Sequence, residues 1–294
     1  MTTITTLQKC YDDFLIDQAV RGNSPVTIRD YRWQLGFFVR FAGPDLPISA
    51  VTLSLCKNYV LSLRSGSLSS VTIQTYIRAL RAFLSWCYEE DLLSENIPER
   101  LRLPKAQRKV IDILTFSESS RLLSSFDQST FLGLRNYVIC ALMLDSGLRL
   151  NEVVMLRLDC LHLDDGYIIV LGKGNKQRFV PVGVTTSQAL RRYLPSVPAS
   201  SVSLFVQLDG SPITLTTLKQ LFRKLKVEVD IPRLRAHLLR HTFATRYLEN
   251  GGDIYSLQQI LGHTSLEMVK RYLHGLSRHS VEKFPRFSPL DNMK

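Results

Sequence analysis

Residues 235–274 read RAHLLRHTFATRYLENGGDIYSLQQILGHTSLEMVKRYLH, and this stretch decides the fold of the C-terminal part of the chain. His237 and Arg240 lie three positions apart in a run without Pro or Gly, so a helix would place both on one face. Leu239 and Phe243 follow each other at a spacing of one helical turn. The pattern predicts a helix that packs an apolar stripe on a core and presents a polar pair.

Signals for two more helices follow. The Asn-Gly-Gly run at 250–252 predicts a helix stop, and Asp253 can cap a second helix that continues to Leu261. Gly262 ends that helix, and a third helix carries Tyr272. A guanidinium, two imidazoles and a phenol are therefore gathered in one short segment.

These residue types favour phosphoryl transfer. An arginine matches two phosphate oxygens with its planar fork of donors, and a tyrosine becomes a nucleophile where a base and positive charge assist it. A second arginine and a lysine are then expected upstream, to stabilise the transition state and to protonate the leaving oxygen. Arg149 occurs in SGLRLNE at 146–152, and Lys173 in VLGKGNKQRFV at 170–180, where two β-type runs flank a turn typical of a hairpin.

Four motifs now stand in order along the chain. They are GLRxxE from Gly147, GKGNKxR from Gly172, HxLRH from His237, and LGH followed by Tyr272. In this combination and spacing the sequence resembles the tyrosine recombinase family, also called the phage integrase family, over nearly its whole length. The architecture is similar to the Xer-like form, with two domains and no arm-binding domain before them.

The resemblance implies a role for each motif residue. Tyr272 would attack a DNA phosphate and leave a 3′-phosphotyrosyl link with a free 5′-hydroxyl. Lys173 would protonate the leaving oxygen, and His237 would act as general base. Arg149 and Arg240 would clamp the non-bridging phosphate oxygens. His263 would donate a hydrogen bond to the phosphate, and Glu152 would orient the site. The family needs no cofactor and no metal.

Composition and charge agree with a DNA partner. Residues 1–100 carry ten Lys and Arg against ten Asp and Glu, whereas residues 101–294 carry 27 against 16. All of the net charge of +11 therefore lies in the second part, which favours a polyanionic partner. The longest apolar run, 137–144, is too short to cross a bilayer, and the five cysteines are scattered without a CxxC pair. A cytoplasmic, nucleoid-associated protein with reduced thiols is expected.

The predicted fold is mostly α with a small β-sheet or hairpin. Residues 1–97 are expected to form a core-binding domain of four helices, 98–111 a linker, and 112–294 a mixed α/β catalytic domain with a C-terminal tail. Within the catalytic domain, helices are expected near 130–146, 150–156, 187–193 and 214–227, with the sheet region at 167–182.

Basic and polar side chains on these elements are candidates for DNA contact. Each has an ordinary alternative: a solvated helix face, an exposed linker or, for Arg178, support of the hairpin. The candidates are Arg29, Arg32, Thr72, Gln74, Arg78, Lys105, Lys176, Arg178, Lys219 and Arg223.

Several alternatives remain open. Lys176 competes with Lys173 as the proton donor, and Tyr247 is the nearest rival nucleophile. Histidines outside the catalytic assignments are interpreted as core residues that satisfy a hydrogen bond: His162, His241, His274 and His279. The resemblance implies that the enzyme acts on a specific recombination site in double-stranded DNA. A mobile element is the expected context, with a Xer-type resolvase of chromosome or plasmid dimers as the alternative.

Two other classes share the chemistry or the fold, namely a type IB topoisomerase and an inactive DNA-binding regulator. For a recombinase, the expected partners are further copies in a homo-tetramer on two DNA sites, and accessory DNA-bending proteins or a partner recombinase. No membrane partner is expected.

Overall fold

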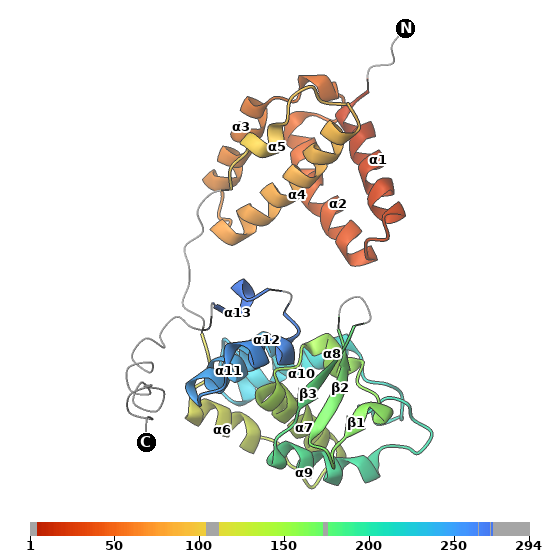
Figure 1. Cartoon of the computed structure of the whole chain (residues 1–294), viewed down its shortest axis with the longest axis vertical. Coiled ribbons are helices and arrows are strands. Elements are labelled where there is room, and N and C mark those ends of the chain that lie inside the picture. Colours follow the sequence, from red (N-terminus) through yellow and green to blue (C-terminus); the bar gives the residue numbers. More distant parts are fainter. Residues whose placement is uncertain (1–4, 104–111, 173–175, 264, 271, 273–294) are drawn as a thin grey trace, which may run out of the picture. The chain divides into compact units, whose positions relative to one another are not determined.

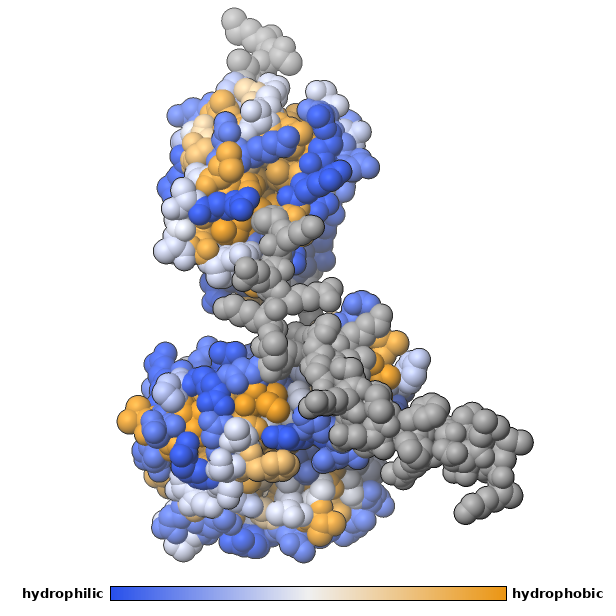
Figure 2. Space-filling model, turned by 90° about the vertical axis from the view of Figure 1, so that its left-hand side faces the viewer, coloured by the Kyte–Doolittle hydropathy of each residue, from blue (hydrophilic) through white to orange (hydrophobic). Residues whose placement is uncertain are grey.

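The computed structural model describes residues 5–103, 112–172, 176–263, 265–270 and 272. The chain divides into two compact units, residues 1–109 and 110–294, each with a separate hydrophobic core. The expected class, mostly helical with one small sheet, is confirmed (Figure 1). On the face shown in Figure 2, hydrophobic residues are interspersed among hydrophilic ones.

The first unit is a helical bundle. Its helices are α1 (Leu7–Val20), α2 (Pro25–Ala42), α3 (Leu53–Ser65), α4 (Ser70–Glu89) and the short α5 (Ile97–Arg100), with a 3-10 turn at Ile48–Ala50. Side-chain caps start the four long helices at Thr6, Ser24, Thr52 and Ser69. Because Leu101 is buried in this core, the packed part of the unit extends beyond residue 97.

The second unit surrounds a buried helix. Its elements are α6 (Phe116–Ser124), α7 (Phe131–Ser146), α8 (Leu150–Val154), β1 (Leu161–His162), β2 (Tyr167–Leu171), β3 (Gln177–Pro181), α9 (Val184–Tyr193), α10 (Leu215–Glu228), α11 (Ala236–Glu249), α12 (Ile254–Leu261) and α13 (Glu267–Lys270), with 3-10 turns at Leu158–Cys160 and Leu194–Ser196. Helix α7 is apolar on most sides and packs against α9 and α11. It thereby fixes the N-terminal and C-terminal halves of the unit to each other.

The sheet is antiparallel in the order β1-β2-β3. Strands β2 and β3 pair from Tyr167 opposite Pro181 to Leu171 opposite Gln177, as the hairpin pattern predicts. The two-residue strand β1 is an addition, because so short a strand leaves no alternation to detect. Helix α9 also begins three residues earlier than expected, since Gly183 starts it without a side-chain cap.

Candidate active site

Arg240 lies at the centre of the motif residues, on the buried face of α11. One guanidinium nitrogen, Nη1, donates to the carbonyl of Gly147 at 2.6 Å, and Nη2 donates to the carbonyl of Leu261 at 2.7 Å. Nη2 also lies 3.0 Å from Nε2 of His263. Burial, and then the positive charge of Arg149, lower the pKa of Arg240 to about 10, so the side chain is still a cation at neutral pH. Arg240 therefore joins three separate segments.

A buried carboxylate, Glu152, organises the second arginine. Its oxygens accept from Nη1 of Arg149 at 2.8 Å, and from Nη1 and Nη2 of Arg178 at 2.9 Å each. Arg178 also donates through Nε to the carbonyl of Ile260 at 2.7 Å. Desolvation raises the pKa of Glu152, but the bonds and charges of Arg178 and Arg149 outweigh it and hold the pKa below its ordinary value. The ionised carboxylate thus links α8 to β3, and Arg178 continues the connection to α12.

The two motif arginines meet at the C-terminal end of α12. Arg240 reaches the carbonyl of Leu261, and Nη2 of Arg149 lies 3.5 Å from the next carbonyl, that of Gly262. Gly262 has φ +61 and ends the helix, as its position in the sequence predicts. Because the side chain of Arg149 is still 33% exposed, this pair of like charges can accept an anion from solvent.

Tyr272 contacts α11 through His241, the residue that follows Arg240. It follows the short helix α13 and does not lie on it, in contrast to the expected third helix. Its hydroxyl is 3.0 Å from Nδ1 of His241, and only 2% of the residue is exposed. The rings of His237 and His241 are 6.4 Å apart between centroids, and His237 is exposed. The sequence interpretation of His241 as an ordinary core histidine is incomplete, because its hydrogen-bond partner is Tyr272. No local sequence pattern predicts this hydrogen bond, because His241 and Tyr272 lie 31 positions apart.

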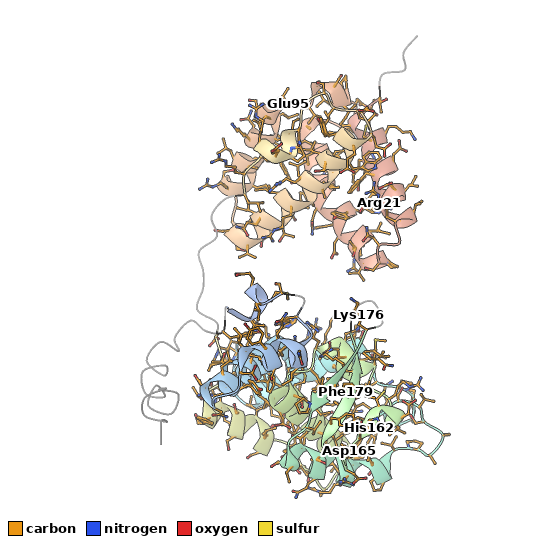
Figure 3. The ribbon with its side chains drawn as sticks, viewed as in Figure 1. Arg21, Glu95, His162, Asp165, Lys176 and Phe179 are labelled. Carbon is orange, nitrogen blue, oxygen red and sulfur yellow. The ribbon has the colours of Figure 1, made fainter. Side chains whose placement is uncertain are left out.

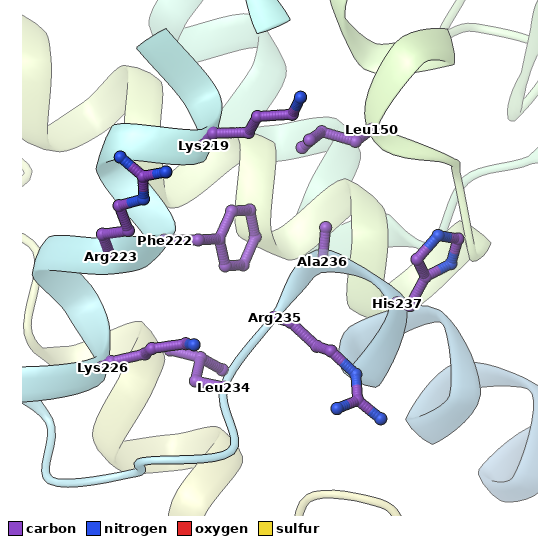
Figure 4. A pocket seen from close by; sticks show the side chains of 9 residues that line it. All are labelled: Leu150, Lys219, Phe222, Arg223, Lys226, Leu234, Arg235, Ala236 and His237. Carbon is purple, nitrogen blue, oxygen red and sulfur yellow. The ribbon is translucent and has the colours of Figure 1, made fainter. Parts of the chain in front are cut away.

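A basic pocket opens beside His237 (Figure 4). It has a volume of about 260 Å³, with Phe222 and Leu234 among its apolar lining residues. Its cations are Lys219, Arg223, Lys226 and Arg235. The sequence predicts the helical cations of α10 but not Arg235, which precedes α11 in an extended conformation that no periodicity reveals.

The other DNA-contact candidates are distributed over both units. Arg29, Arg32, Arg78 and Lys176 are exposed, whereas Thr72 and Gln74 are half-buried. Lys176 immediately precedes β3, and Phe179 lies on that strand (Figure 3). Arg178 differs from the expectation of a DNA contact, because its guanidinium faces inward onto Glu152. Lys173 and Lys105 lie outside the described residues, as do His274 and His279.

Two general features of the described residues bear on the site. No three His, Cys, Asp or Glu side chains within them are grouped as metal ligands. None of their helices combines the length and the apolar character that a membrane span requires.

Two family profiles match the chain. Residues 112–279 match the phage integrase family, and residues 10–91 match the phage integrase N-terminal SAM-like domain. Among known proteins, tyrosine recombinase XerD of Listeria innocua is 30% identical over 291 residues, covering 95% of this chain and 98% of XerD. Tyrosine recombinase XerC of Xylella fastidiosa is 32% identical over 267 residues, covering 90% of each chain.

Solved structures share the fold. The Tn1549 transposon integrase in complex with transposon right end DNA has a TM-score of 0.79 at 21% identity, covering 97% of this chain and 99% of that one. The XerA recombinase has a TM-score of 0.53 at 27% identity, covering 96% of this chain and 99% of that one. The arrangement of helices and sheet is therefore that of integrases and Xer recombinases.

Proposed function

This chain belongs to the phage integrase family of tyrosine recombinases, whose reaction is site-specific DNA recombination, and we propose that Tyr272 is the nucleophile through which it breaks and rejoins DNA. The phenolic oxygen attacks the phosphorus, a 3′-phosphotyrosyl bond forms, and the bond to the 5′-oxygen breaks. Rejoining is the reverse attack by a 5′-hydroxyl, so the bond energy is retained in the intermediate.

The surrounding cations and imidazoles take the other roles. Arg149 and Arg240 bind the non-bridging oxygens, where charge accumulates in the transition state. His237 takes the phenolic proton, His263 donates a hydrogen bond to the phosphate, and Lys173 gives a proton to the leaving 5′-oxygen. The observation that carries the proposal is the meeting of both guanidinium groups at the C-terminal end of α12, together with the hydrogen bond of Tyr272 to His241 of α11, the helix that bears Arg240.

Covalent trapping on a nicked suicide duplex tests the nucleophile. The wild-type protein is expected to form an adduct that resists denaturation, and Tyr272→Phe is expected to form none. Tyr247→Phe is the matched control, because Tyr247 is the nearest rival and should be dispensable. An adduct that persists in Tyr272→Phe, or disappears only in Tyr247→Phe, would refute the assignment.

The biological role we propose is recombination of a mobile element by a tetramer on two DNA sites in the cytoplasm, with accessory DNA-bending or partner proteins. A Xer-type dimer resolvase is the second candidate, and the identity to XerD over nearly the full chain favours it. The two roles differ in their DNA substrate. Excision of an element between its own ends supports the first role. Resolution of a plasmid dimer that carries two copies of a chromosomal recombination site supports the second.

A further inference from the structure

Trp33 is a large aromatic residue on the surface of the first unit. It lies on α2 and is 66% exposed. Its ring packs edge-on against Phe37, with centroids 5.4 Å apart and planes at 80°, and Phe37 packs in the same way against Tyr76 of α4 at 5.3 Å. The guanidinium of Arg40 lies 4.7 Å above the ring of Phe37. Trp33 is therefore the outer end of a supported aromatic row, which holds the indole in place while most of it contacts solvent.

The charge around this row is segregated. Residues 1–100 are neutral in sum, yet α2 and α4 together carry five arginines against two acids, Asp30 and Glu89. The arginines are Arg29, Arg32, Arg40, Arg78 and Arg81. Acidic residues are concentrated elsewhere in the unit, for example on α1, where Asp12, Asp13 and Asp17 oppose Lys9. The two helices that form the aromatic row thus carry a net positive charge in a unit that is neutral in sum.

From this arrangement we propose that Trp33 contacts duplex DNA and helps to determine sequence specificity by packing against a thymine C5-methyl group. The proposal rests on the proposed function, since it supposes that the first unit binds the recombination site. Arginines on the same two helices meet the phosphates and fix the register, while the indole reaches the base edges. A protein partner would need an acidic surface to match these arginines, and duplex DNA already provides one along its length.

The chemistry of base edges identifies thymine. The major groove is about 12 Å wide and admits a helix, and its base edges are hydrogen-bond donors and acceptors apart from the methyl group of thymine. An indole ring has one hydrogen-bond donor, its N–H, and is otherwise apolar. The thymine methyl group is therefore the base-edge group on which it can pack. Because the indole packs on Phe37, which is itself held by Tyr76, little conformational entropy is lost on contact.

A double-mutant cycle between protein and DNA tests the contact. The probe is a duplex selected from a randomised library by the wild-type protein, in which each thymine is replaced in turn by deoxyuridine, which lacks only the methyl group. One replacement is expected to weaken wild-type binding about fourfold, the value of one buried methyl group. Trp33→Ala is expected to weaken binding about tenfold and to become insensitive to that replacement.

Ile16→Ala is the matched control variant. Ile16 is 62% exposed, like Trp33, but it lies on the acidic helix α1, so its loss should leave affinity unchanged. Fluorescence gives an independent readout, because the chain has two tryptophans and Trp86 is 93% buried. Quenching of the exposed indole on DNA addition is expected in the wild type and should be absent in Trp33→Phe.

The outcomes separate the two proposals. If Trp33→Ala binds the selected duplex as tightly as the wild type, or retains the full sensitivity to deoxyuridine, the contact is refuted while covalent trapping can still succeed. If Trp33→Ala binds one site normally but fails to bring two sites together, the aromatic row meets another copy of the chain and the contact is again refuted. If the wild type selects no duplex and forms no adduct, the proposed function itself fails.

Discussion

At the scale of single residues, the enclosed phenol of Tyr272 is the most consequential detail. Its hydroxyl is bonded to His241 and 2% of the residue is exposed. A phosphate of duplex DNA cannot reach an oxygen so enclosed unless the segment moves. The hydrogen bond with His241 stabilises this enclosed position.

His241→Ala is expected to make Tyr272 accessible in the absence of DNA. One hydrogen bond contributes about 1 kcal/mol, so its loss should raise the exposed population about fivefold. Nitration with tetranitromethane followed by peptide mapping measures this. Tyr255, at 63% exposure, should react in both proteins, and Tyr193, at 0%, in neither. Equal protection of Tyr272 in the variant and the wild type would contradict the expected role.

The gathering of the motif residues was partly predictable from the sequence. The motif spacing predicts that Arg149, Arg240 and Glu152 belong to one site, and the structure brings them together. The spacing does not reveal that Arg178 turns inward to Glu152, or that Arg240 binds two main-chain carbonyls. Such partners depend on how distant segments pack. A main-chain carbonyl is present in every residue, so the sequence does not indicate which one will accept a hydrogen bond.

At the scale of elements, the turn between α7 and α8 positions the arginines. Gly147 ends α7 with φ +64, and its carbonyl accepts from Arg240. A side chain at this position would overlap the ring of Phe243 and lie 2.9 Å from Leu261. Glycine is therefore required here both by the backbone conformation and by the close approach of α11 and α12.

Gly147→Ala is expected to destabilise the second unit by about 3 kcal/mol, from left-handed strain of about 1 kcal/mol and overpacking of about 2 kcal/mol. Gly166→Ala is the matched control. Gly166 has φ +76 but nothing within 4 Å of the added carbon, so the strain of about 1 kcal/mol acts alone. Denaturant unfolding measures both variants, and equal losses would show that packing at Gly147 contributes nothing.

The start of α6 gives the second unit an acid-sensitive element. Glu118 accepts from the Thr115 amide at 2.8 Å as part of a capping box and binds Arg233 at 2.6 Å. Hydrogen bonds from Arg233, and then from Thr115, lower the pKa of Glu118 from 4.5 to about 2. The folded state therefore binds this proton less readily than the unfolded state does.

The stabilisation is present above pH 4.5 and is lost as the pH falls toward about 2. Glu118→Gln is expected to lower stability at neutral pH and to flatten the fall between these limits. Thermal unfolding across this pH range measures the difference. A slope that is as steep in the variant as in the wild type would assign the acid sensitivity to other carboxyl groups.

Helix boundaries were predictable where a side chain marks them. Asp253 caps a helix at the expected place, and Thr52, Ser69 and Thr115 are cap residues of the same marked kind. Element ends without such a marker were missed, as at Gly183. The end of helix α4 at Glu89 is unmarked in the same way, because Asp91 adopts a positive φ of 57 that no local pattern indicates.

At the scale of the whole molecule, the two units are independent in their packing. Their hydrophobic clusters have no residue in common, and each contains about 20 or more buried side chains. The residues proposed to carry out chemistry all lie in the second unit. The first unit contributes no member of the catalytic set, so its expected contribution is affinity and sequence preference.

A fragment of residues 112–294 is consequently expected to fold and to form the covalent adduct on a nicked duplex. Its affinity should fall about tenfold or more, because the contacts of the first unit are lost. Gel-shift titration and adduct yield at saturating DNA separate the two effects. A folded fragment that yields no adduct at saturation would show that the first unit completes the site.

On the proposed function, the enclosed position of the Tyr272 hydroxyl has a consequence for where strand breaks occur. A basic protein of this kind spends most of its time on unrelated DNA, since phosphate contacts carry no sequence information. If Tyr272 is the nucleophile, a molecule whose hydroxyl is enclosed against His241 of α11 can bind such DNA without nicking it. Breakage would then be limited to encounters whose binding energy repositions Tyr272, so accuracy would be enforced before chemistry begins.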